Sequence, residues 1–381
     1  ELYFNSLSGS IPAGISNNLT SLVYLGLSFN NLTGVVPATS AFLETIDLSH
    51  NHFTRVLTDI NAYVIKLSHN DIRRLPPIKG SVLIIRELDL SYNPLSKGLD
   101  DLFWMDPPDE LVLNLGSCNF SGPFPFTPIG FKLLNLSHNN FTGPLPPEMA
   151  AQKLLETLNI SHNQFYGVVP SAFWDLTGLV SLFMAHNQLE GPLAAALFAP
   201  GLAVFEVQGN AFSGSLPDFA SWKLPSLILL DVSDNQLSGS IPDSISRFVT
   251  LQHLGLGGNN LSGPIPATLG RLLSLTSLNV SGTGLTCPAD GSKCVVQQGN
   301  TTSFCRLCSS FCSSCTPRAW SALSEVPVSA AAPESAAAPA AAPAPAPKAQ
   351  SASAPCTLIA AAINLSGAAA AATLSLLMSG M

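Results

Sequence analysis

The chain has 381 residues, of which 46% are hydrophobic and only 10% charged, and its formal net charge is −8. This balance excludes a broad basic surface for binding nucleic acid. The sequence contains no phosphate-binding loop, no His-Glu-x-x-His zinc signature and no set of kinase motifs. We therefore expect a protein that is not an enzyme and that needs no cofactor.

A repeated motif dominates residues 1–286, and it reads Leu-x-Leu-x-x-Asn-x-Leu-(Ser/Thr)-Gly-x-hydrophobic-Pro. Its Asn returns every 19 to 25 residues, with Cys118 and Thr283 in its place at two turns. Such a period predicts a solenoid of about 13 coils, the first of them truncated. A side-chain amide can both donate and accept hydrogen bonds, so we expect the stacked Asn residues to form a structural ladder. Its members are Asn30, Asn51, Asn70, Asn93, Asn139, Asn163, Asn187, Asn210, Asn235 and Asn259.

The Leu-x-Leu step predicts one short strand in each coil, because side chains alternate between the two faces of a strand. In Leu182-Phe183-Met184, the outer two residues point inward and Phe183 points outward. The outward residues of successive coils form a polar, mildly acidic stripe. We interpret this stripe as a ligand-binding groove, the alternative being an unoccupied solvated face. It comprises Asp47, Lys66, Asp89, Asn114, Asn135, Asn159, Phe183, Glu206 and Asp231.

The segments Asn30-Asn-Leu-Thr-Gly-Val-Val-Pro37, Asn235-Gln-Leu-Ser-Gly-Ser-Ile-Pro242 and Asn259-Asn-Leu-Ser-Gly-Pro-Ile-Pro266 carry the complete extension of the motif. This extension resembles the plant-type subclass of leucine-rich repeats, found in plant and green-algal receptor-like proteins, receptor kinases and polygalacturonase-inhibiting proteins. The resemblance implies a curved right-handed superhelix of the horseshoe type, with a parallel sheet on the concave face and an irregular or 3-10 convex side.

The same resemblance implies extracellular recognition by a receptor-like protein without a kinase, located at the plasma membrane or in the cell wall. The expected partner is a peptide, carbohydrate or protein ligand, with a co-receptor as a further partner. Two alternatives remain open, namely an inhibitor of a secreted cell-wall hydrolase and a structural wall or adhesion protein.

Three consecutive repeats, after Asn51, Asn70 and Asn93, depart from the motif and carry charged residues instead. The longest insertion follows Ser96 and contains an apolar group that is either a binding anchor or convex packing. As a hypothesis, residues 55–110 form a platform that selects the partner, with Arg73, Arg74 and Trp104 as its main contacts.

Five histidines occupy one slot just before the ladder residue, and they are His50, His69, His138, His162 and His186. A metal row would also require a carboxylate or thiol at converging geometry. Ser-His-Asn is a common filling of this slot in the resembled family, so we expect a structural role and no metal. Ligand recognition that depends on pH is the alternative, since histidine titrates near neutral pH.

Residues 287–318 are rich in cysteine and predict a cap on the last coil of the solenoid. Six cysteines are expected to form disulfides, as is usual outside the cell, and a tight four-thiolate zinc site is the alternative. They are Cys287, Cys294, Cys305, Cys308, Cys312 and Cys315. Glycosylation sequons arise from the repeat itself, so only some need carry a glycan, and Asn18 and Asn300 are the main candidates.

Residues 319–355 are rich in Ala and Pro, which predicts an extended stalk. Residues 356–381 carry no charged side chain and follow a segment of small residues. This ending resembles a glycosylphosphatidylinositol-anchor signal, and a single membrane-spanning helix is the rival interpretation. Because the chain opens inside a repeat, we expect its natural start to lie further upstream.

Overall fold

The computed structural model describes residues 1–12, 15, 21–39, 42–56, 60–74, 85–96, 110–125 and 130–286. The chain divides into two compact units, Glu1–Ser313 and Ser314–Met381, and all described residues lie in the first. The predicted cap, stalk and hydrophobic tail lie outside the described residues, as do Asn18, Trp104 and Asn300. Within the described part, no helix is long and apolar enough to cross a membrane.

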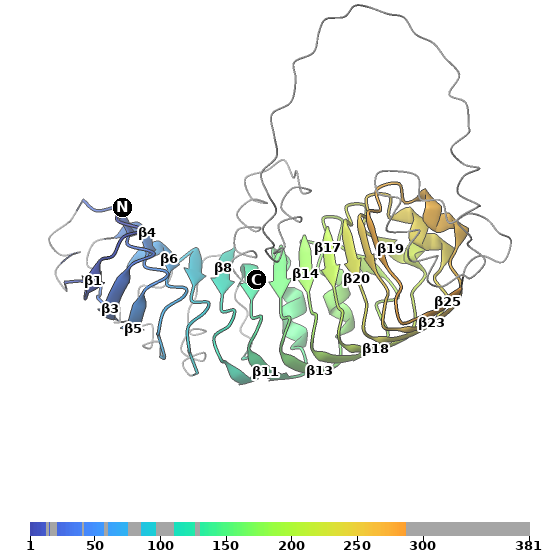
Figure 1. Cartoon of the computed structure of the whole chain (residues 1–381), viewed down its shortest axis with the longest axis horizontal. Helices are drawn as coiled ribbons and strands as arrows, with labels where there is room; N and C mark the ends of the chain where they lie inside the picture. The colour runs from blue at the N-terminus through green and yellow to red at the C-terminus, as the bar shows by residue number, and fades with distance from the viewer. Residues whose placement is uncertain are drawn as a thin grey trace, which may run out of the picture. The chain divides into compact units, whose positions relative to one another are not determined.

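Successive Leu-x-Leu steps form one parallel sheet, which we call the long sheet, with each repeat adding a strand beside the previous one (Figure 1). The predicted solenoid is therefore confirmed. The long sheet has twelve described strands: β2 (Tyr24–Gly26), β4 (Leu43–Asp47), β6 (Ala62–Lys66), β7 (Glu87–Asp89), β8 (Leu111–Asn114), β10 (Phe131–Asn135), β12 (Thr157–Asn159), β14 (Ser181–Phe183), β17 (Val204–Glu206), β20 (Leu229–Asp231), β22 (His253–Gly255) and β24 (Ser277–Asn279).

A second row of parallel strands, which we call the lateral sheet, begins directly after the ladder residues (Figure 1). It consists of two separate pieces. The first piece contains β1 (Ser8–Gly9), β3 (Asn31–Val36) and β5 (His52–Val56). The second contains β9 (Ser121–Pro123), β11 (Asn140–Gly143), β13 (Gln164–Val168), β15 (Gln188–Gly191), β18 (Ala211–Ser215), β21 (Gln236–Gly239), β23 (Asn260–Pro264) and β25 (Gly284–Thr286).

The break in the lateral sheet falls on the repeats of Asn70 and Asn93, whose described residues form no lateral strand. All the described strands of the second piece except β25 contain a glycine at positive φ, such as Gly167 at 81°. An arginine occupies the equivalent position in two of the departing repeats, Arg55 after Asn51 and Arg74 after Asn70. Of the three repeats that depart from the motif, the one after Asn51 keeps a lateral strand, β5, and the two after Asn70 and Asn93 form none among their described residues.

The convex side of the second half is made of short 3-10 helices. They are η2 (Pro147–Ala151), η3 (Ser171–Asp175), η4 (Phe219–Ser221), η5 (Asp243–Arg247) and η6 (Ala267–Arg271), and a two-stranded sheet joins β16 (Leu197–Phe198) to β19 (Trp222–Lys223). A motif proline such as Pro146 caps four of these helices, because its fixed φ suits the start of a helical turn.

The core is a continuous apolar spine between the two sheets and the convex side. Beneath the lateral sheet, Phe120, Phe141 and Phe165 stack in successive coils with ring centroids 6.0 Å apart. Each coil therefore buries its apolar side chains mainly against its two neighbours, which is the energetic basis of a repeat array.

Candidate ligand-binding surface

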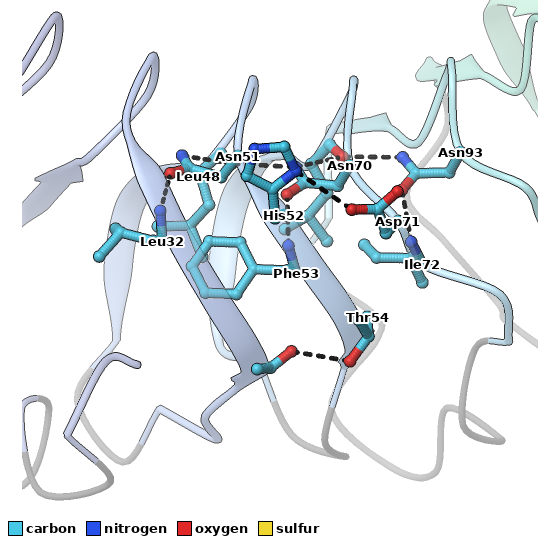
Figure 2. A network of polar contacts seen from close by, with 12 residues as sticks. Leu32, Leu48, Asn51, His52, Phe53, Thr54, Asn70, Asp71, Ile72 and Asn93 are labelled. Atoms are coloured by element: carbon cyan, nitrogen blue, oxygen red, sulfur yellow. Dashed lines mark hydrogen bonds and ion pairs between the residues drawn. The ribbon is translucent and has the colours of Figure 1, made fainter. Parts of the chain in front are cut away.

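The Asn ladder satisfies the backbone at the turn between the long and lateral sheets. Asn70 shows the pattern, because its Oδ1 accepts a hydrogen bond from the Phe53 N–H at 2.9 Å (Figure 2). Its Nδ2 donates to the carbonyl oxygens of Leu48, Leu67 and Ser68 at 3.0, 3.0 and 3.2 Å. Each ladder amide therefore links two successive coils, and the side chain is committed to the fold.

Two residues take the place of Asn in the ladder, and each still donates a hydrogen bond to a backbone carbonyl oxygen. The Cys118 thiol donates to the Leu90 carbonyl oxygen at 3.2 Å, and the Thr283 hydroxyl donates to the Val280 carbonyl oxygen at 2.7 Å. Burial raises the pKa of the Cys118 thiol to about 12, so this group is a donor and not a nucleophile.

The outward residues of the long sheet, predicted to bind a ligand, are largely engaged within the protein. In five repeats the carboxylate or amide Oδ1 accepts hydrogen bonds from both the backbone N–H and the hydroxyl of a serine two residues later. These pairs are Asp47 with Ser49, Asp89 with Ser91, Asn159 with Ser161, Asp231 with Ser233 and Asn279 with Ser281. The recurring Asp/Asn-x-Ser spacing is a signal in the sequence that could have indicated this role.

Other members of the predicted stripe also have internal partners. The Asn135 Nδ2 donates to the Asn114 Oδ1 at 2.8 Å, and the Lys66 ammonium lies 3.3 Å from the Glu87 carboxylate. Burial raises the pKa of the Glu206 carboxyl group. The Phe183 ring is half-buried. Many polar groups of the stripe therefore have partners within the protein, and its role in ligand binding stays a prediction. Arg73 and Arg74, by contrast, are exposed.

The slot before the ladder residue has a left-handed backbone in every described coil. Its non-glycine members have φ between 51° and 55°, where His, Asn and Asp are tolerated better than most residues. This explains why the slot holds His in five repeats, Asp234 in one, and Gly209, Gly258 and Gly282 in three others. The alternation of His, Asp and Gly at one position is the sequence signal for this conformation.

The shared backbone conformation stacks the slot side chains face to face. One stack, the amino ladder, runs through Phe4, Phe29, His50, His69 and Tyr92, with adjacent ring centroids 3.9–4.2 Å apart. A second stack, the carboxyl ladder, joins His138 to His162 at 4.2 Å and His162 to His186 at 4.4 Å. Ser117 occupies the one slot between the two ladders.

The histidines of these ladders are biased toward the neutral form. Burial lowers the pKa of His50, His69, His138 and His162, and neighbouring histidines lower it further for all of these except His69. Among the residues that the structure describes, no group of three or more His, Cys, Asp or Glu side chains is arranged to hold a metal ion. The geometry is that of stacked neutral rings.

An open hollow of about 470 Å³ lies where the lateral sheet is broken. Its floor is formed by the ladder residues Asn51, Asn70 and Asn93, which Figure 2 shows in a row. The lining also includes His69, Tyr92 and Ser117, which precede ladder residues in the chain, and His52, Asp71, Pro94 and Asn119, which follow them. The His52 Nδ1 lies 3.2 Å from the Asp71 Oδ2, and both side chains are about half exposed. This hollow offers accessible rings, the Asp71 carboxylate and the Asn119 amide in one place. It lies largely within the predicted partner platform of residues 55–110, but the sequence did not indicate these lining residues.

Comparisons with known proteins agree with this geometry. Residues 129–189, 226–248 and 250–272 match leucine-rich-repeat family profiles. A comparison with curated protein sequences gives no match.

Solved structures with the same fold include the Arabidopsis receptor kinase HAESA in complex with the peptide hormone IDA and the co-receptor SERK1. The sequence identity between this chain and HAESA is 25%, the match covers 76% of this chain, and the TM-score is 0.57. The plant peptide hormone receptor RGFR1 in complex with RGF2 gives 26% identity over 74% and a TM-score of 0.58. The ectodomain of GASSHO1/SCHENGEN3 from Arabidopsis thaliana was solved in complex with CASPARIAN STRIP INTEGRITY FACTOR 2. It has 25% sequence identity to this chain, the match covers 74% of this chain, and the TM-score is 0.54.

The chain covers 58%, 50% and 41% of these three structures, so it spans about half the length of the receptors that it matches. Repeat pattern, fold and family profiles agree that this chain carries leucine-rich repeats, and its fold is similar to that of the plant peptide-hormone receptors named above.

Proposed function

We propose that this protein is an extracellular, non-enzymatic binding module that recognises a peptide ligand at the hollow beside the amino ladder. The observation that carries the proposal is the hollow itself, in which accessible polar and aromatic groups gather where the lateral sheet is broken. The long-sheet stripe is a weaker candidate, because its carboxylates and amides already have partners inside the protein.

Peptide recognition is favoured by the chemistry of the lining. The carboxylate of Asp71 accepts hydrogen bonds, the amide of Asn119 both donates and accepts them, and the ring of Tyr92 offers apolar area. Extended peptides need such alternating polar and apolar contacts along a groove. Receptors of the same fold in complex with peptide hormones support this choice of ligand class.

The proposal is tested by selecting ligands from a display library of random twelve-residue peptides with the full chain as bait. An enriched peptide is then titrated calorimetrically into the wild type and into two variants, Asn119→Arg and Asn260→Arg. Both residues are exposed and follow the ladder position, but only Asn119 lines the hollow. Asn119 also has a positive φ of 60°, which Asn260 lacks, so the stability of each variant is measured beside its affinity. We expect Asn119→Arg to weaken binding at least ~10-fold, because a bulky cation fills the hollow, and Asn260→Arg to leave it unchanged.

Failure to enrich any peptide, or an equal loss of affinity in both variants, would contradict peptide binding at this hollow. Circular dichroism and thermal unfolding of both variants serve as the control for folding.

A further inference from the structure

The row of stacked rings is interrupted at one slot, and this interruption creates a gap of defined shape. Tyr92 stacks on His69 through one face, at a centroid distance of 4.1 Å. The next coil places Ser117 in the slot, and the coil after that places His138, which stacks on His162 at 4.2 Å. The Tyr92 and His138 rings are thus separated by two coil spacings, with a small side chain between them.

The gap has the dimensions of one flat group. Consecutive coils place their rings 3.9–4.4 Å apart wherever both slots hold an aromatic or imidazole side chain. A planar group inserted above Ser117 would contact a ring on each side at this ordinary stacking distance. The hollow described above reaches Tyr92 and Ser117, so the gap is accessible from solvent.

Two carboxylates lie near the gap. Asp71 lies in the wall of the hollow, and the negative charge of Asp89 acts on both His69 and Cys118, which belong to the coils on either side of Tyr92. Lys66 and Lys132 are paired with Glu87 and Glu156 at 3.3 and 3.6 Å. Asp71 lies 3.2 Å from the His52 Nδ1, and the exposed Arg73 and Arg74 follow it in the chain, so the attraction for a cation at the gap comes mainly from Asp89 and the ring faces. The ring faces add to the attraction, since the π-face of an aromatic ring is electronegative.

We propose that the gap between Tyr92 and His138 binds the guanidinium group of an arginine side chain in the peptide ligand. A guanidinium is planar, stacks on aromatic faces and is weakly hydrated, whereas a lysine ammonium is a compact, strongly hydrated point charge. Its N–H groups find acceptors in the Ser117 hydroxyl and the Asn119 side-chain oxygen. This inference rests on the proposed peptide-binding function and specifies one residue of the ligand.

The decisive variant is Ser117→His, which completes the ring row with the residue that five other coils carry in this slot. The backbone is already suitable, because Ser117 has a φ of 55° and the slot histidines have φ of 51–53°. Asp234→His is the matched control, since Asp234 has a φ of 51° in the same slot of a distant coil. Tyr92→Asn is a second test variant, because Asn tolerates this backbone and removes one ring face.

The experiment titrates N-acetyl-arginine amide into the full chain and follows binding by saturation-transfer NMR. N-acetyl-citrulline amide, which is planar but neutral, and N-acetyl-lysine amide, which is charged but not planar, are the comparison probes. We expect arginine amide to bind with a dissociation constant of about 1–10 mM and the two other probes to bind at least ~5-fold more weakly. Ser117→His and Tyr92→Asn should abolish arginine binding, and Asp234→His should preserve it.

Undiminished arginine binding in Ser117→His and Tyr92→Asn, or equal binding of the three probes, would overturn the arginine site. The arginine site is also overturned if arginine amide shows no binding to the wild type at a concentration 20 times the upper limit of the expected dissociation constant. These outcomes leave peptide binding standing if the display peptides still bind in a way that Asn119→Arg disrupts. Conversely, arginine binding in the gap without any enriched peptide supports the site and removes the proposed function.

Discussion

The two halves of the described solenoid differ in what lies outside the Asn ladder. Residues 130–286 form a regular array with uninterrupted lateral strands and a series of 3-10 helices on the convex side. Residues 21–125 keep the same long sheet and the same ladder bonds, but lose lateral strands in two coils and have no described 3-10 helix.

This difference shows that the two sheets depend on separate parts of the repeat. The Leu-x-Leu-x-x-Asn part specifies the long sheet and the turn, and it is present in both halves. The Ser/Thr-Gly-x-hydrophobic-Pro part accompanies the lateral strands and 3-10 helices of the regular half. The three coils after Asn51, Asn70 and Asn93 lack it, and of these only the first keeps a lateral strand, β5. The chain can therefore vary its lateral face without disturbing the stacking of coils, and the hollow lies where it has done so.

The largest expected effect comes from the apolar spine. Phe53 and Phe212 occupy the same position in the two halves, and neither has any exposed area. Replacing either by Ala should cost about 3–5 kcal/mol through the cavity that it leaves. Hydrogen exchange should show that Phe212→Ala loosens the whole regular half, whereas Phe53→Ala loosens mainly residues 21–56, which end where the lateral sheet breaks. Equally wide loosening in both variants would show that the break does not separate the two halves.

The ladder should behave alike in both halves. Asn70 and Asn163 each make four hydrogen bonds to the backbone, with closely similar distances. Ala at either position leaves buried backbone groups without partners and should cost about 1–3 kcal/mol, which urea unfolding measures. A cost at Asn70 far below that at Asn163 would mean that the irregular half does not depend on its ladder. Asn163→Asp, which keeps the acceptor but loses the donors, is the control.

A smaller effect is expected from the glycine of a lateral strand. Gly167 has a φ of 81° and open space where a Cβ would lie, so Ala there introduces backbone strain without a steric clash. We expect a loss of about 1–2 kcal/mol in urea unfolding for Gly167→Ala and a smaller loss for Gly167→Asn. If Gly167→Ala is neutral, a regular lateral strand needs no glycine at this position, as β5 with Arg55 already forms without one.

The smallest expected effect is a dependence of stability on pH that originates in the ring ladders. The pKa of His50, His69, His138 and His162 is lowered by folding, so the unfolded chain binds more protons between those lowered values and the ordinary value. The contribution of these histidines to the free energy of unfolding is fully present above about pH 6.5, and it decreases as the pH falls below that value. Burial raises the pKa of Glu206, which acts in the opposite direction, so Glu206→Gln is a suitable background.

The measurement is the urea midpoint at pH 7.5 and at pH 5.5. In the Glu206→Gln background, we expect a lower urea midpoint at pH 5.5 than at pH 7.5. The double substitution His138→Asn and His162→Asn should reduce this difference. A midpoint that changes by the same amount with and without these histidines would assign the pH dependence to other groups.

The regular features of this fold were predictable because each depends on one repeated residue type. The period of the Asn residues predicted the coils, and the Leu-x-Leu alternation predicted the buried faces, as Leu182 and Met184 show. The hollow was not predictable, because it results from what two coils lack. The local hydrogen bonds of Asp47 and its equivalents went unpredicted for another reason, which is that an outward position does not exclude a bond from the serine two residues later.

Cys118 makes the irregular half accessible to a chemical measurement of its opening. Its thiol is buried, protonated at neutral pH and hydrogen-bonded to the Leu90 carbonyl oxygen, so an alkylating reagent can react only when the coil separates from its neighbour. The rate of labelling at this residue, located by peptide mass mapping, therefore reports how often the wall of the hollow comes apart. Because the thiol is native, this measurement needs no engineered label. A ligand that holds the coils together should lower the rate of labelling.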